Sequence, residues 1–138
     1  MSEGGAVRRA PLLVLAVACA ALGCARAESA AEAARRRCLS LVESLPRYEA
    51  EERAWPRSAS LACEERAQDR AAELLALRRG IAESCAAASG GGDIAPLLEA
   101  TDEVIGCAAC GEGYVPRCRH ARELFVEMDS ALRRARLR

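Results

Sequence analysis

Lysine and asparagine are absent from the sequence, so arginine supplies all of the positive side-chain charge. The 20 basic residues balance 20 acidic ones, and both kinds are interspersed along the chain instead of gathered in blocks. A protein that binds a nucleic-acid backbone needs a clustered basic surface. The sequence therefore predicts no nucleic-acid partner.

Aromatic residues are also scarce, at 3% of the chain, and histidine occurs once, as His120. The core must then be built from aliphatic side chains and alanine, and small side chains bury little apolar surface each. We expect such a domain to be stabilised by covalent cross-links. The sequence has no motif for nucleotide or glycan binding and no local signature that places a nucleophile beside His120. We therefore expect neither a cofactor nor enzymatic activity.

Three pairs of neighbouring acids could be taken for paired catalytic carboxylates. We expect them on solvated faces of helices instead, because carboxylates are mostly exposed in folded proteins. The pairs are Glu51–Glu52, Glu64–Glu65 and Asp102–Glu103.

An apolar run without charge, at 12–22, follows Arg8 and Arg9 and is followed by Gly23 and Cys24. A basic start, an apolar run and small residues, in this order, are typical of an export signal. The run is shorter than the ~20 apolar residues that a helix needs to span a bilayer. The sequence therefore predicts an exported protein.

The end of this leader, Ala21-Leu22-Gly23-Cys24, resembles the lipobox of bacterial lipoproteins, in which the cysteine is lipidated and becomes the new N-terminus. The match is partial, because the commonest pattern has Leu three residues before the cysteine and Ala or Ser two before it. The resemblance covers the leader alone and implies a lipid anchor on Cys24 in the bacterial cell envelope. One alternative is cleavage after Ala27, at an A-x-A site, which would release a secreted chain. Another is that Cys24 is an incidental cysteine of the leader.

The chain is thus divided into an export signal at 1–24, a tether or start of the first helix at 25–34, and a cysteine-rich helical domain at 35–138. In the domain, apolar residues recur at spacings of three and four, the period of an amphipathic helix. Pro46 should end or interrupt the first helix, and loops are expected at 46–57, around the glycines that end at residue 92, and between Cys107 and Pro116. The predicted fold is all-α, a small antiparallel four-helix domain cross-linked by disulfides.

Six cysteines follow the leader, and an even number in a small exported domain is typical of a disulfide framework. Many pairings are possible. We favour pairs that bracket the first and last loops symmetrically, with the two remaining cysteines joined to each other. The preferred pairs are Cys38–Cys63, Cys107–Cys118 and Cys85–Cys110.

A zinc site is the main alternative for the last three cysteines. Cys107, Cys110, Cys118 and His120 are a possible tetrahedral ligand set, and Cys-x-x-Cys-Gly resembles the knuckle of zinc-ribbon domains. However, zinc ribbons continue into a β-hairpin, whereas this segment continues into a helix, and the other three cysteines would be left as an odd set. A thiol-redox role for Cys107 and Cys110 is also possible, although the pair ends a helix, where the dipole disfavours a thiolate.

We therefore expect no metal and a non-enzymatic role. The predicted function is a small exported, lipid-anchored binding or structural module of the cell envelope, attached to the membrane through Cys24, with an unidentified protein or small molecule as its ligand. The alternative function is a zinc-binding or thiol-redox protein that uses Cys107, Cys110, Cys118 and His120.

Overall fold

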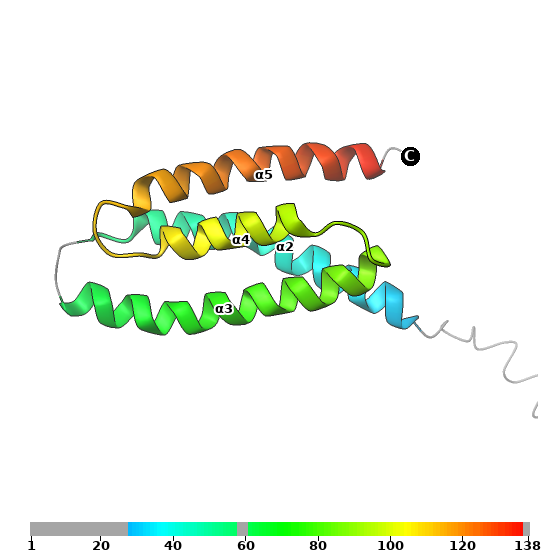
Figure 1. The fold of residues 1–138 in the computed structure, drawn as a ribbon, viewed down its shortest axis with the longest axis horizontal. Coiled ribbons are helices and arrows are strands. Elements are labelled where there is room, and N and C mark those ends of the chain that lie inside the picture. Colours follow the sequence, from blue (N-terminus) through cyan, green and yellow to red (C-terminus); the bar gives the residue numbers. More distant parts are fainter. Residues whose placement is uncertain (1–27, 58–60, 137–138) are drawn as a thin grey trace, which may run out of the picture.

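The computed structural model describes residues 28–57 and 61–136, and this part of the chain folds into four helices without a strand (Figure 1). The helices are α2 (Ala30–Ala54), α3 (Leu61–Ser89), α4 (Ala95–Cys107) and α5 (Tyr114–Arg136). Successive helices run in opposite directions, and α3 and α5 lie on opposite sides of the pair formed by α2 and α4 (Figure 1). The predicted all-α, disulfide-linked four-helix domain is confirmed. The predicted export signal and Cys24 lie outside the described residues.

Helix α2 begins within the segment predicted as a tether or helix start. Ser29 caps it, since its hydroxyl accepts a hydrogen bond from the Glu32 N–H at 3.2 Å while the Glu32 carboxylate accepts one from the Ser29 N–H at 2.8 Å. This reciprocal pair is a capping box, which satisfies two backbone donors that the helix leaves free. Of the two possibilities for 25–34, the start of a helix is therefore the one found from Ala30 onward.

Pro46 does not end α2, and the expected loop at 46–57 was wrong for most of its length. A proline inside a helix removes one backbone hydrogen bond and costs about 3 kcal/mol. Burial on both sides of Pro46 offsets this cost, because Val42, Leu45, Glu49 and Glu52 are buried at spacings of three and four. The buried face of α2 thus continues through the proline, and its second half carries glutamates where the first half carries aliphatic residues.

The core lies between all four helices and is made of small and aliphatic side chains, as the composition predicted. A glycine allows α2 and α3 to approach closely, since a Cβ on Gly80 of α3 would lie 3.0 Å from Leu41 Cδ1 of α2. The buried apolar cluster consists of Val42, Leu45, Leu74, Leu77, Ile81, Cys85, Ala100, Val104, Ala108 and Ala121.

All six cysteines of the described part form disulfides, and these link the helices in series. Helix α2 is joined to α3, the first turn of α3 to the segment after α4, and the end of α4 to α5. The pairs are Cys38–Cys85, Cys63–Cys110 and Cys107–Cys118.

The preferred pair Cys107–Cys118 is confirmed, whereas Cys38–Cys63 and Cys85–Cys110 were wrong. Since α2 continues to Ala54, the turn of the α2–α3 hairpin lies later than expected, and Cys38 faces the far half of α3. Cys63 lies 22 positions before Cys85 in the same helix, about 33 Å away along its axis. Cys63 is therefore out of reach of Cys38 and lies beside Cys110 instead.

Candidate functional site

The alternative zinc set is not assembled. Cys110 is bonded to Cys63, Cys107 is bonded to Cys118, and His120 faces Glu103. Within residues 28–57 and 61–136, the group of side chains close enough to share a metal ion is Glu49, Cys107 and Cys118, and a disulfide occupies both of its sulfur atoms. The prediction that three thiolates and His120 could form one site was wrong, because the thiols are divided between two disulfides.

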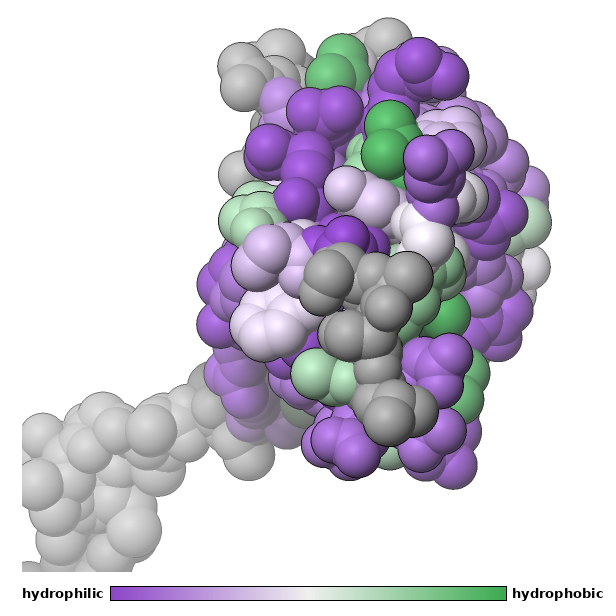
Figure 2. All heavy atoms as spheres, turned by 90° about the vertical axis from the view of Figure 1, so that its left-hand side faces the viewer, coloured by the Kyte–Doolittle hydropathy of each residue, from purple (hydrophilic) through white to green (hydrophobic). Residues whose placement is uncertain are grey.

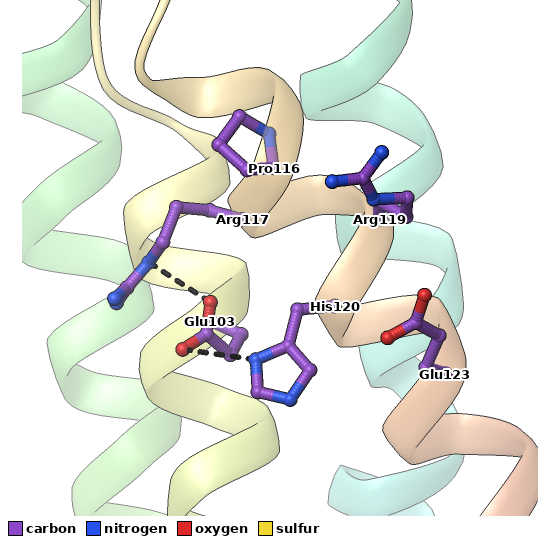
Figure 3. Close-up of a pocket in the computed structure, with 6 residues that line it drawn as sticks. All are labelled: Glu103, Pro116, Arg117, Arg119, His120 and Glu123. Carbon is purple, nitrogen blue, oxygen red and sulfur yellow. Dashed lines mark ion pairs between the residues drawn. The ribbon is translucent and has the colours of Figure 1, made fainter.

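A shallow, open hollow lies where the first turns of α5 meet α4 (Figure 3). Glu103 of α4 points into it, with Oε2 at 2.9 Å from Arg117 Nε and Oε1 at 3.5 Å from His120 Nδ1. The Arg117 contact is an ion pair without hydrogen-bond geometry. A Cβ on Gly106 would overlap the Arg117 guanidinium, so this glycine lets Arg117 lie across α4.

The hollow offers charged groups but no hydroxyl or thiol. Its walls are formed by two carboxylates, two guanidinium groups, one imidazole and a proline ring. With no hydroxyl or thiol beside His120, the imidazole has nothing to activate in the manner of a nucleophile and base pair. The lining residues are Glu103, Pro116, Arg117, Arg119, His120 and Glu123.

The most completely buried ionic group is the Glu52 carboxylate of α2, which was expected on a solvated face. Arg66 of α3 donates to both of its oxygens, at 2.7 and 3.3 Å, and Arg70 donates to Oε1 at 2.5 Å. Burial raises the pKa of the Glu52 carboxyl, but the hydrogen bonds from Arg66 and Arg70 outweigh it and hold the pKa below its ordinary value. Glu52 is therefore a buried anion that binds α2 to α3.

Other arginine–carboxylate pairs join further helix contacts. Arg78 of α3 donates to both oxygens of Asp102 of α4, at 2.6 and 3.1 Å. Arg122 of α5 lies 3.6 Å from the buried carboxylate of Glu49 of α2. The expectation that the acid pairs face solvent was wrong for Glu52 and Glu103, since both are buried. The three and four spacing that Glu49 and Glu52 continue from Val42 is the sequence feature that indicates their burial.

Arg57 ties together the C-terminal ends of α2 and α4. Its side chain donates four hydrogen bonds to backbone carbonyls, three of them at 2.6, 2.8 and 3.3 Å. Backbone carbonyls at a helix end have no partner within the helix, and a cation there also complements the helix dipole. The guanidinium lies 3.6 Å from the centre of the Tyr114 ring at the start of α5. The acceptors at α2 are the carbonyl oxygens of Glu52, in its last turn, and of Trp55, just after it. Those at α4 are the carbonyl oxygens of Cys107, its last residue, and of Ala109, beyond its end.

Replacing Arg57 with alanine is expected to lower the free energy of unfolding by about 2–3 kcal/mol, because several charge-assisted hydrogen bonds are lost. Arg57→Lys should recover less than half of this, since a lysine cannot reproduce the planar fork of donors. Urea unfolding followed by circular dichroism measures both. Arg47→Ala is the matched control, because Arg47 is exposed and lies 3.9 Å from Glu51; an Arg57→Ala loss no larger than that of the control would contradict the assignment.

Comparison of the chain with protein-family models, with curated proteins and with solved structures finds no match. The site is therefore described from its own geometry. It consists of three disulfides and a set of arginine–carboxylate pairs that hold the four helices together. The disulfides indicate an oxidising, extracellular setting. None of the four described helices is both long enough and apolar enough to cross a membrane.

Proposed function

We propose that the protein is a small exported, non-enzymatic module of the bacterial cell envelope, held at a membrane by lipid on Cys24, that binds a partner or plays a structural role. The observation that carries the proposal is the pairing of all six cysteines of the described part into disulfides. Disulfides form and persist in oxidising compartments and are rare in the reducing cytosol. The leader at 1–24 supplies the route of export.

The physical properties of the domain support a binding or structural role over catalysis. Its charged groups pair mainly with one another across helix contacts, as Glu52 does with Arg66 and Arg70. The hollow beside His120 is shallow and has no hydroxyl or thiol in its wall. What the domain presents is a rigid, cross-linked helical surface.

Export and anchoring are tested together by mass spectrometry of the mature protein in its producing bacterium. We expect no alkylatable thiol without reduction, and an N-terminal peptide that begins at Cys24 and carries acyl chains. A chain that begins at Glu28 would refute the anchor and leave export standing. An intact leader on a product with reduced thiols would refute both.

The anchor is tested separately by substitution in the leader. We expect Cys24→Ser to move the protein from the membrane fraction to the soluble fraction, because the thiol that receives the lipid is lost. Cys19→Ser is the matched control, since Cys19 lies in the same apolar leader and outside the lipobox-like segment. Equal distribution of the two variants between the fractions would contradict lipidation of Cys24.

A further inference from the structure

The three disulfides differ in how far solvent reaches them. Cys107 and Cys118 are 0% and 2% exposed, so neither sulfur of that bridge is open to attack. The other two bridges each join a buried cysteine of α3 to a partly exposed one elsewhere. Thiol–disulfide exchange requires that a thiolate reach one sulfur while the other departs. Among the described disulfides, a thiolate can therefore reach only Cys38–Cys85, at Cys38, and Cys63–Cys110, at Cys110.

The position of the departing sulfur in α3 separates these two candidates. Cys63 is the third residue of α3, where the backbone N–H groups have no acceptor within the helix and the dipole favours an anion. Cys85 lies toward the opposite end of α3, where the N–H groups are used by the helix and the dipole disfavours an anion. Attack on Cys110 thus releases a thiolate that its helix stabilises, whereas attack on Cys38 does not. The neighbouring Glu64 and Glu65 are exposed, so solvent screens their opposing charge.

We propose that Cys63–Cys110 is a thiol–disulfide exchange site that takes two electrons from a partner protein carrying a dithiol. A partner thiolate attacks Cys110 Sγ, a bond forms between these two sulfurs, and the Cys63–Cys110 bond breaks with its electron pair leaving on Cys63. The second partner thiolate then attacks the partner's own sulfur in the mixed disulfide and releases Cys110 as a thiolate. The partner leaves with a new disulfide, and Cys63 and Cys110 are reduced.

The surroundings of Cys110 allow this bridge to open while the fold remains closed. On its N-terminal side, Arg57 binds the Ala109 carbonyl at 2.8 Å, and Cys107 is bonded to Cys118. The segment between α4 and α5 is therefore held in place independently of Cys63. Exchange at Cys110 requires no unfolding of the bundle.

Exposed apolar side chains lie at the same end of the bundle. Trp55 directly follows α2 and is 39% exposed, and Val115 is the second residue of α5 and is 53% exposed. The contacts of Arg57 with the ends of α2 and α4 and with the Tyr114 ring bring these segments together. Figure 2 looks onto this end, where apolar surface occurs in small separate areas among hydrophilic side chains. A dithiol partner could contact these areas while it attacks Cys110.

The test uses the unmodified, fully oxidised protein and dithiothreitol as the dithiol probe. Samples are quenched at intervals, alkylated with N-ethylmaleimide and mapped by peptide mass spectrometry. We expect Cys63 and Cys110 to be labelled at least about tenfold faster than the other four cysteines, because access and leaving-group stability both favour this bridge. Earlier labelling of Cys38 and Cys85, or equal rates for all six cysteines, would overturn the proposal.

Two single variants then identify the attacked sulfur. In Cys63→Ser the Cys110 thiol is left free, and in Cys110→Ser the Cys63 thiol is left free. We expect the Cys110 thiol to react with a chromogenic aromatic disulfide about tenfold faster, because Cys63 is 5% exposed in the folded protein. Circular dichroism would first be used to check that both variants are folded. Equal rates, or a faster reaction of Cys63, would refute attack at Cys110.

Discussion

Replacing Glu52 with alanine is expected to lower the free energy of unfolding by about 3–5 kcal/mol, the usual cost of removing one partner of a buried ion pair. Its side chain is fully buried, and the two arginines that bind it, Arg66 and Arg70, are themselves 24% and 18% exposed. Without the carboxylate, two guanidinium groups face each other beside an empty volume. Urea unfolding under non-reducing conditions measures the loss.

Glu51→Ala is the matched control for this prediction. Glu51 is the adjacent acid and also binds Arg70, but its side chain is 43% exposed. A solvent-exposed ion pair contributes about 0–1 kcal/mol. The same cost for both variants would show that burial of Glu52 contributes nothing to stability.

The acid sensitivity of the protein should also depend on Glu52. Since the pKa of this carboxyl is lower in the folded protein than in the unfolded chain, its contribution is present above the unfolded value of about 4.3 and is lost as the pH falls through the folded value. Glu52→Gln keeps the shape of the side chain and cannot take up the proton. Its free energy of unfolding should therefore fall less steeply below about pH 4.3 than that of the unmodified protein.

Replacing Cys38 and Cys85 together with alanine is expected to lower the free energy of unfolding by about 4 kcal/mol. A bond that closes a loop of 47 residues lowers the conformational entropy of the unfolded chain by about that free energy. The bridge spans 47 residues, and Cys63–Cys110 spans the same number. The Cys63→Ala, Cys110→Ala variant is therefore a control of matched loop length. The Cys107–Cys118 bridge spans 11 residues, so its entropic contribution is about 3 kcal/mol.

Differential scanning calorimetry of three variants, each with both cysteines of one disulfide replaced by alanine, ranks the contributions of the three disulfides to stability. A smaller loss for Cys38 and Cys85 than for Cys107 and Cys118 would contradict the role of loop length. Cys38–Cys85 and Cys63–Cys110 close loops of equal length and should restrict the unfolded chain equally. A difference in stability between these two variants therefore measures how well each bridge packs in the folded protein. Cys85 is 2% exposed and belongs to the buried cluster, so its removal also leaves a small cavity.

The fold class could be predicted because it depends on local periodicity. Helical spacing of apolar residues and the absence of alternating segments were enough for a four-helix domain. Cys107–Cys118 could be predicted for the same reason, since it closes one short segment between two adjacent helices. Export, and lipid on Cys24, remain predictions.

The pairing of Cys38–Cys85 and Cys63–Cys110 could not be predicted because it depends on the length of α2, which the rule that proline ends a helix underestimates. Proline usually ends a helix, and the charged residues after Pro46 look like a solvated loop. The structure buries two of those charges against arginines of α3 and α5, an arrangement between distant segments that propensity does not report. Extending α2 by two turns displaced the hairpin turn, and with it the partners of Cys38 and Cys63. The roles of Arg57 and Glu52 were missed for the same reason.

The order of the disulfides also determines how the domain would bear a stretching force. When the two ends of the domain are pulled apart, the force reaches the cross-linked part of the chain at Cys38 and at Cys118. The Cys38–Cys85 and Cys107–Cys118 bonds then carry the force in place of 39–84 and 108–117. Tension then falls on 85–107, with the Cys63–Cys110 bond providing a parallel route of similar span. Even with every helix unwound, the chain between Cys38 and Cys118 would extend to less than about a third of its own contour length, which makes this part of the domain a tether of limited reach.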